Sequence, residues 1–179
     1  MKIMKMTALL TLLLLSVLAQ GAEITKGPLI KGFGGHLAVK KLDYPIPNGV
    51  MRAAFDVSKT PEEADELNRS LNTPARFLNM HAARGVPSKN MDLAIVVHGA
   101  AAKDLLSNKA YNKKFLVNNP NAELLTALHN EGVRIIVCGQ TKEYREYSDD
   151  DLLPFVEVSL SALTALIDLQ QKGYALIAF

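Results

Sequence analysis

Residues 118–140 read NNPNAELLTALHNEGVRIIVCGQ and contain one complete helix followed by one strand. The asparagine-rich start is typical of a helix N-terminus, and three leucines recur along the turns that follow, at Leu124, Leu125 and Leu128. Gly132 is placed to end this helix. The run at residues 133–138 follows at once without alternating polar and apolar residues, which indicates a strand buried on both faces.

The same arrangement recurs along the chain. Unbroken apolar runs at residues 50–57, 93–97 and 174–179 predict three further strands. Strands of this kind that alternate with helices imply a parallel sheet with helices on both faces. We therefore expect one flavodoxin-like, three-layer α/β/α domain with a mainly parallel sheet at residues 49–179. Residues 22–48 carry glycines and prolines at short intervals and predict an extended N-terminal arm.

The first helical region contains both a start signal and a proline. Thr60 can cap a helix in which Pro61 takes the first position and Glu63 completes a capping box. Because Pro74 removes a donor from the helix interior, the pattern predicts two helices, at residues 61–70 and 73–83. In the second helix we expect three side chains to turn partly inward: Phe77, Leu78 and Met80.

Two further helical segments are predicted. One or two helical turns are expected at residues 100–106. The acidic run at residues 149–151 is typical of a helix N-terminus, where the helix dipole favours negative charge. The long helix that follows is expected to bury one face with a period of 3.6 residues and to end at Gly173. The expected buried residues of that helix are Val156, Leu160, Leu163 and Ile167.

The first 21 residues have the pattern of a secretory signal peptide. Lys2 and Lys5 precede an apolar run at residues 6–19, and Gly21 lies at a small-residue cleavage position. The apolar run is shorter than the roughly 20 residues that span a bilayer. We therefore expect a periplasmic protein that has no membrane segment once the signal has been removed.

The charge balance of the remaining chain excludes one class of partner. Of the 20 Lys and Arg residues, Lys2 and Lys5 lie in the signal peptide, which leaves 18 against 18 Asp and Glu. No basic run or basic stripe with interleaved aromatic residues occurs, so nucleic-acid binding is not expected.

Two of the predicted strands end in a chemically capable residue that a glycine follows. These pairs are His98-Gly99 and Cys138-Gly139, and Cys138 is the only cysteine in the chain. Ligands of open parallel sheets bind outside the carboxyl ends of the strands, where a histidine or a helix N-terminus would favour a thiolate. We therefore predict a site in which Cys138 is the catalytic thiol. The expected binding residues are His98, Gly99, Asn119, Asn121, Gly139 and Gln140.

Each of these residues also has a structural explanation that the sequence leaves open. Cys138 can be a small buried hydrophobic residue, and His98 can be a hydrogen-bonded core histidine. Asn119 and Asn121 are adequately explained as helix caps, and Gln140 as a loop residue.

The sequence lacks the motifs of metal sites, nucleotide-binding sites and α/β-hydrolases. The four histidines show no zinc-ligand spacing, and a single cysteine adds little, so no metal is predicted. The glycines at residues 32–35 follow no strand and precede no apolar helix, which makes them a poor nucleotide motif. Neither a P-loop nor a Gly-x-Ser-x-Gly elbow is present, and no cofactor is expected.

Several blocks together resemble the DsrE/DsrF-like family, and most closely its small exported branch. In chain order, the blocks are VVHGAAAKDLL (96–106), NNPNAELLTAL (118–128), GVRIIVCGQT (132–141), LLPFVEVSLSALTAL (152–166) and GYALIAF (173–179). The likeness runs from about Met51 to the last residue. Cys138 matches the Cys-Gly-Gln block of the exported branch, whereas the sulfur-carrying cysteine of better-known relatives lies in another sequence context. Many members of the branch have Arg-Gly where this chain has Arg145 and Glu146.

The resemblance implies a single α/β domain that forms homo-oligomers, commonly trimers or hexamers. Better-known relatives act in sulfur relay, in which a cysteine takes up persulfide sulfur and passes it on. The leading hypothesis is therefore an exported persulfide carrier or thiol-handling protein, whose partner is a donor or acceptor protein or a small sulfur species. Two alternatives stay open, a non-catalytic module that binds a small ligand and a structural oligomeric protein.

Overall fold

The computed structural model describes residues 23–178 and shows five strands, five α-helices and three short 3₁₀ helices in this range. The predicted signal peptide, residues 1–21, lies outside the described residues. In chain order the elements are β1 (Met51–Val57), α1 (Arg69–Ala82), η1 (Ser88–Asn90), β2 (Met91–Val97), η2 (Gly99–Leu105), α2 (Asn108–Phe115), α3 (Ala122–Asn130), β3 (Arg134–Cys138), α4 (Gly139–Tyr144), η3 (Asp149–Asp151), β4 (Glu157–Ser159), α5 (Ala162–Gln171) and β5 (Ala175–Ala178).

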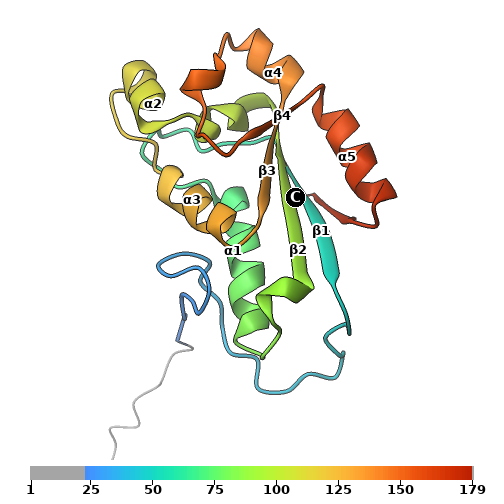
Figure 1. The fold of residues 1–179 in the computed structure, drawn as a ribbon. Coiled ribbons are helices and arrows are strands. Elements are labelled where there is room, and N and C mark those ends of the chain that lie inside the picture. The colour runs from blue at the N-terminus through green and yellow to red at the C-terminus, as the bar shows by residue number, and fades with distance from the viewer. Residues whose placement is uncertain (1–22, 179) are drawn as a thin grey trace, which may run out of the picture.

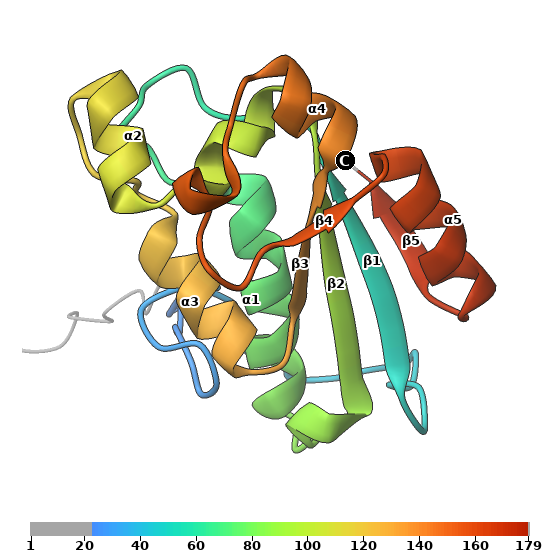
Figure 2. The ribbon, with the colours of Figure 1, turned by 45° about the horizontal axis from the view of Figure 1, so that its top comes forward.

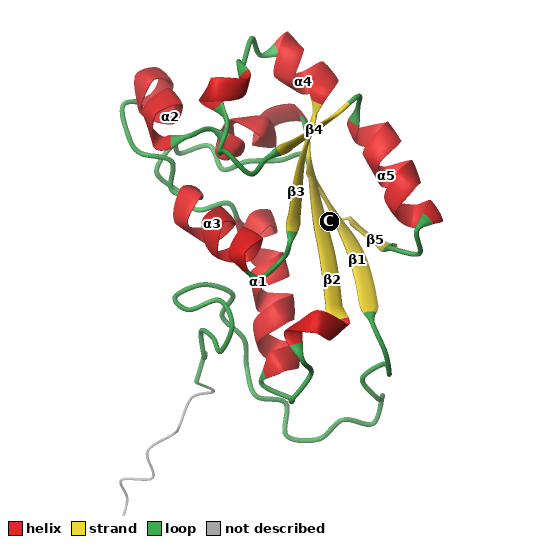
Figure 3. Cartoon of the chain, in the orientation of Figure 1, coloured by secondary structure: helices red, strands yellow, loops and turns green. Residues whose placement is uncertain are grey.

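The five strands form one sheet in the order β4-β3-β2-β1-β5, and all four neighbouring pairs are parallel. Figures 1 and 3 show α1 and α3 on one side of the sheet and α5 on the other. The predicted three-layer, parallel α/β class is therefore confirmed. The strand order differs from the 2-1-3-4-5 order of flavodoxin itself.

The two faces of the sheet bury different side chains. The face toward α1 and α3, called here the α1 face, carries large apolar residues such as Phe55, Leu93 and Ile95. The opposite face, called here the α5 face, carries Ala54, Ala94, Val96, Ile136 and Cys138. Because successive residues of a strand point to opposite faces, the two sets alternate along each strand. Both faces are thus buried, as the unbroken apolar runs predicted.

The prediction of two helices around Pro74 was wrong. A single helix, α1, runs through Pro74 from a cap at Asn68, whose Oδ1 atom accepts a hydrogen bond of 2.9 Å from the Ser70 N–H. The lost hydrogen bond at Pro74 is tolerated because Leu71, Pro74 and Leu78 are buried on one side of this helix. Met80, which was expected to turn inward, is exposed.

No helix forms at residues 61–68 because the predicted cap has another partner. The Thr60 hydroxyl donates to the Asp104 carboxylate at 3.0 Å instead of to a helix backbone. The Asn68 side chain donates to the Lys59 carbonyl at 2.8 Å and holds the end of the same segment. Tertiary hydrogen bonds therefore override the local capping signal.

The region after Cys138 also differs from the prediction. The polar stretch that begins at Thr141 lies partly in α4, which starts directly after β3, and the acidic run forms the short η3 with a capping box between Ser148 and Asp151. The short strand β4 then precedes α5.

The expected apolar face of the last helix is turned outward. Leu160 and Leu163 are each 73% exposed and Ile167 is 55% exposed. The buried side of α5 consists of Ala162, Ala165 and Leu169. Small alanines let the helix lie close to a sheet face that is itself lined by alanines, and the larger residues point away.

The N-terminal arm lies against α1, as Figure 2 shows for the segment before β1. The Asn79 side chain accepts a hydrogen bond from the Ile30 N–H at 2.8 Å and donates to the carbonyls of Ile30 and Phe33, both at 3.0 Å. Gly34 contacts the helix backbone so closely that a Cβ atom there would lie 2.3 Å from the Ala75 carbonyl carbon. Apart from an isolated bridge between Thr25 and His36, the arm contains no helix or strand.

Candidate functional site

A row of three side chains lies on the α5 face at the carboxyl edge of the sheet. Asp56 is opposite Val96 in the β1–β2 register, and Val97 is opposite Val137 in the β2–β3 register. His98 and Cys138 therefore follow at neighbouring positions, on chains roughly 4.8 Å apart, as in any sheet. The alternation of side chains places all three on the same face as Ala54, Val96 and Ile136.

His98 is oriented by Asp56. Its Nε2 atom donates a hydrogen bond of 2.9 Å to the Asp56 Oδ1 atom, and both side chains are partly exposed. This bond leaves Nδ1 as the ring nitrogen that can accept a proton. The carboxylate holds the ring in this orientation, so Nδ1 can act as a base.

The Cys138 thiol lies between the first turns of two helices. Burial has the largest influence on its pKa and raises it, but several hydrogen bonds together outweigh this effect. The donors are the Thr141 hydroxyl and the backbone N–H groups of Thr141, Ala162 and Gln140, so the thiol pKa is lowered from its usual range. Thr141 and Gln140 belong to α4, whereas Ala162 begins α5. The sequence predicted a more acidic thiol, and the direction of this shift agrees.

Glycine is required directly after the cysteine. A Cβ atom at Gly139 would lie 2.4 Å from the Ser159 carbonyl oxygen, because β4 pairs with β3 at this point. The Ser159 hydroxyl donates to the carbonyls of Val137 at 3.2 Å and Ser161 at 2.8 Å. These contacts hold the connection to α5 beside the cysteine.

Gly99 and Gln140 connect the cysteine to its surroundings. The Gly99 N–H donates to the Thr141 hydroxyl oxygen at 3.3 Å, so the hydroxyl that serves Cys138 is tied to the segment after His98. Gly99 has a φ of 58°, a conformation that side chains disfavour. The Gln140 Nε2 atom donates to the Leu160 carbonyl at 3.4 Å. Of the predicted residues, five are thus brought together: Cys138, His98, Gly99, Gly139 and Gln140.

Asn119 and Asn121 belong to a different, buried network. The Asn119 side chain donates to the carbonyls of Asp104 and Leu106, at 2.8 and 2.6 Å, and accepts from the Asn121 N–H at 2.9 Å. The Asn121 Oδ1 atom accepts from the Asn68 N–H at 2.8 Å. These contacts tie both side chains into the packing of η2, α1 and α3, whereas the buried Asn121 Nδ2 atom has no partner among the described residues. The binding role predicted for Asn119 and Asn121 therefore stays a prediction.

Asp104 lies at the centre of this network. Its carboxylate accepts hydrogen bonds from the Asn68 side chain at 2.7 Å and from the Thr60 hydroxyl at 3.0 Å, and Lys103 lies 3.5 Å away. Burial raises the pKa of Asp104 and these partners lower it, with a net rise. Such a network joins segments that lie far apart in the sequence, which is a structural role.

Sequence reasoning missed Asp56 and Thr141. Asp56 is the only acidic residue in the apolar run of the first strand and has the same side-chain parity as Ala54, which could have placed it beside His98. Thr141 was assigned to a polar loop because the short helix α4 has no apolar period. Its hydroxyl matters only through the tertiary contact with Cys138 and Gly99.

Metal binding and membrane insertion find no support in residues 23–178. No group of three or more His, Cys, Asp or Glu side chains in this part of the chain could hold a metal ion. None of the described helices is long and apolar enough to cross a membrane.

Comparisons with known proteins agree with this fold. The model of the DsrE/DsrF-like family matches residues 64–179. A protein of unknown function from Methanobacterium thermoautotrophicum is 19% identical, with a TM-score of 0.52, over 72% of this chain and 99% of its own. The ychN protein from E. coli is 21% identical, with a TM-score of 0.52, over 73% of this chain and 100% of its own. At these identities the two structures show the fold alone, and no curated protein matches the sequence.

Proposed function

The chain belongs to the DsrE/DsrF-like family, and from this premise we propose that it is an exported sulfur carrier whose Cys138 accepts sulfur as a persulfide. One observation supports the proposal most directly. The only thiol of the chain has a lowered pKa and lies at the sheet edge beside the Asp56–His98 pair. A sulfur acceptor must be a thiolate, and these neighbours favour that form.

The transfer needs no cofactor to balance. The Cys138 thiolate attacks the outer sulfur of a donor persulfide, R–S–SH, and a new S–S bond forms to the Sγ atom. The S–S bond of the donor breaks, and its electron pair leaves with the donor as a thiolate, R–S⁻. His98, held by Asp56, accepts the proton of the Cys138 thiol at the start and returns it to the leaving thiolate.

The burial of the thiol limits the size of the donor. Cys138 is only 6% exposed, with Ser159 beside it on β4 and the Ala162 N–H donating to its sulfur. A small sulfane species such as polysulfide therefore fits the closed site better than a folded donor protein does. A protein partner would require the connection at residues 159–161, which Gln140 holds at Leu160, to move aside.

Mass spectrometry after exposure to polysulfide tests the proposal. We expect a gain of about 32 Da for one added sulfur, and none in a Cys138→Ser variant that folds normally. Alkylation of the unmodified protein should show an apparent thiol pKa below the usual value for a free cysteine, about 8.5. A slow rate that stays flat to about pH 9, with no sulfur adduct, would make the thiol structural. The non-catalytic binding module or the structural oligomer would then be the better description.

We also propose that the chain assembles as a homo-oligomer. The outward stripe of Leu160, Leu163 and Ile167 supports this, because monomeric proteins rarely leave contiguous large apolar residues in water. The double variant Leu163→Gln/Ile167→Gln should reduce the mass measured by light scattering and leave the circular dichroism unchanged. Replacement of the exposed Gln170 and Gln171 on the same helix by alanine is the control. A wild-type protein that is monomeric at micromolar concentration would contradict the assembly.

Export is the remaining part of the proposal. It is supported by the charged start, apolar run and small-residue cleavage position of the first 21 residues. The intact mass of protein recovered from the periplasm should place the mature N-terminus between Gln20 and Glu23. Retention of residues 1–19 would contradict it.

A further inference from the structure

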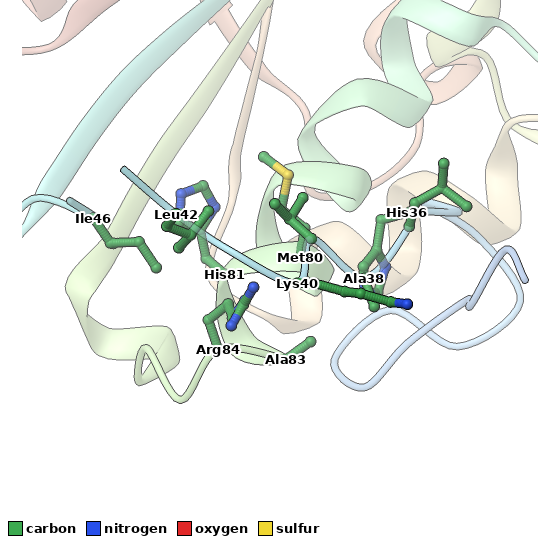
Figure 4. A pocket seen from close by; sticks show the side chains of 11 residues that line it. His36, Ala38, Lys40, Leu42, Ile46, Met80, His81, Ala83 and Arg84 are labelled. Atoms are coloured by element: carbon green, nitrogen blue, oxygen red, sulfur yellow. The ribbon is translucent and has the colours of Figure 1, made fainter. Parts of the chain in front are cut away.

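A cavity of about 380 Å³ lies between the N-terminal arm and the end of α1, away from the Cys138 row. Figure 4 shows its two walls, with His36, Ala38, Lys40, Leu42 and Ile46 on the arm, and with Met80, His81, Ala83 and Arg84 at the helix end. The arm residues precede the part of the chain that matches the family. One wall of the cavity therefore lies outside the part of the chain that matches the family, and the other wall lies inside it.

The arm is anchored before it reaches the cavity. Asn79 binds the backbone of Ile30 and Phe33, and Asn72 accepts a hydrogen bond of 2.8 Å from the Gly34 N–H. Two backbone hydrogen bonds of 2.9 Å between Thr25 and His36 close the loop at the first residue of the cavity wall. The start of this wall is thus fixed to α1, which reduces the entropic cost of ordering the rest of it around a ligand.

Apolar side chains that line this cavity remain open to solvent. Leu37, Val39, Leu42 and Met80 are between 40% and 52% exposed. Each would bury more apolar surface against a hydrocarbon ligand, at roughly 25 cal/mol per Å² removed from water. Small-molecule sites occupy roughly 300–1,000 Å³, so a cavity of this size suits one short chain better than a two-chain lipid.

The charged residues of the lining are all basic. Lys40 and Arg84 line the cavity together with His36 and His81, and no acidic residue does. The nearest acid on the arm, Asp43, pairs with Lys41 at 2.7 Å. Within the part of the chain that the structure describes, neither Lys40 nor Arg84 has an acidic partner. The His81 Nδ1 atom donates a hydrogen bond of 2.8 Å to the Phe77 carbonyl. The Nε2 atom of the ring therefore points away from that carbonyl.

We propose that this cavity binds a single-chain anionic amphiphile, a medium-chain carboxylate whose hydrocarbon tail packs against the apolar walls and whose head pairs with Lys40 and Arg84. The apolar lining accounts for the tail and the unpaired cations account for the charge of the head. Cys138 does not line this cavity. The test of the ligand site is therefore independent of the test of the sulfur-carrier proposal.

Calorimetric titration of the purified protein with decanoate tests this site. We expect saturable binding of one molecule per chain, and weaker binding of octanoate by about sixteenfold, since each of the two missing methylenes contributes about fourfold to affinity. Decyltrimethylammonium has the same tail with a positive head and should not bind. Equal binding of this cation would overturn the proposal, as would the absence of decanoate binding.

Three variants locate the site. Lys40→Gln/Arg84→Gln should weaken decanoate binding by about tenfold or more through the loss of charge-assisted hydrogen bonds. Ala83→Trp should fill the cavity and abolish binding, and Arg76→Gln is the matched control, an exposed arginine of α1 outside the lining. Unchanged binding in the first two variants would overturn the assignment. Co-sedimentation with phosphatidylglycerol vesicles without decanoate binding would overturn it in favour of a membrane surface.

Discussion

The two faces of the sheet carry side chains of different size. On the α1 face, large side chains such as Phe55, Leu93 and Ile95 pack against α1 and α3 and are almost completely buried. On the α5 face, small residues such as Ala54 and Ala94 lie under a single helix. Large buried side chains contribute most to stability, so the α1 face is the stabilising one.

The α5 face leaves room for polar groups at both ends of its strands. At the amino end, Asp92 accepts a hydrogen bond of 2.6 Å from the Tyr174 hydroxyl and lies 3.3 Å from Arg52. At the carboxyl end lie Asp56, His98 and Cys138. The groups at the amino end are an acid, a base and a hydroxyl that bind one another, whereas the carboxyl end adds a thiol to the hydrogen-bonded Asp56–His98 pair. The comparison teaches that one face buries the large side chains, and that the thiol proposed to be reactive lies at one end of the other.

The largest expected effect tests the contrast in stability. Ile95→Ala on the α1 face should lower the free energy of unfolding by about 4 kcal/mol, because the cavity it leaves is closed on all sides. Ile136→Ala on the α5 face should lower it by only about 2 kcal/mol, because Ile136 lines a groove between β4 and α5. Urea denaturation measures both. Equal losses would show that the faces contribute alike.

The amino end of the α5 face should respond to alkaline pH. Burial, followed by the hydrogen bond to Asp92, raises the pKa of Tyr174 from 10.0 to about 12. Because the unfolded chain loses this proton at lower pH, the stabilisation is complete below pH 10 and is lost as pH rises to about 12, by about 2–3 kcal/mol. Tyr174→Phe should reduce the slope of stability against pH in this window. An unchanged slope would contradict the role of Tyr174.

At the carboxyl end of the α5 face, we expect a substitution to change the reactivity of the Cys138 thiol. Asp56→Asn should slow sulfur-adduct formation at neutral pH by about tenfold and change its pH profile, because His98 loses the carboxylate that orients it. Asp92→Asn is the matched control, since it removes an acid from the same face at the other end. It should leave the adduct rate unchanged. Equal effects of the two variants would mean that Asp56 acts only through overall stability.

The smallest expected effect concerns the helix that follows the cysteine. Glu146 ends α4 with a φ of 56°, a left-handed conformation that costs a side chain about 1–2 kcal/mol. Glu146→Gly should therefore raise the free energy of unfolding by about 1 kcal/mol. Glu143→Gly, within the same helix, should lower it by a similar amount. Thermal unfolding of both variants measures the difference, and a loss of stability in Glu146→Gly would contradict the explanation.

Long and continuous patterns were sufficient to predict the layers of the fold and part of the site. The apolar runs of β1, β2 and β3 predicted buried parallel strands, and parallel strands place their carboxyl ends at one edge. That rule alone placed His98 beside Cys138. The helix α3 was also predicted, because its apolar period and its terminal glycine agree.

Local signals failed where a tertiary contact competed with them. Thr60 was predicted to cap a helix, but its hydroxyl binds Asp104, 44 residues further on. Asn119 and Asn121 were predicted to bind a ligand, which stays a prediction, and no signal in the sequence indicated that their side chains also join η2 and α1 to the start of α3. Nothing in a short stretch of sequence identifies a partner so distant, because the competing hydrogen bond exists only after the chain has folded.

The sequence by itself determined the parallel sheet, the carboxyl edge and the presence of one thiol there, because strand periodicity and side-chain type are local properties. Only the tertiary structure decided how acidic and how buried that thiol is, because its hydrogen-bond donors come from α4 and the start of α5, and because it packs with residues of α5. The same holds for α5, whose apolar period was evident but whose inward face was not. The packing of Ala162 and Ala165 against a sheet of small residues turned Leu163 and Ile167 outward.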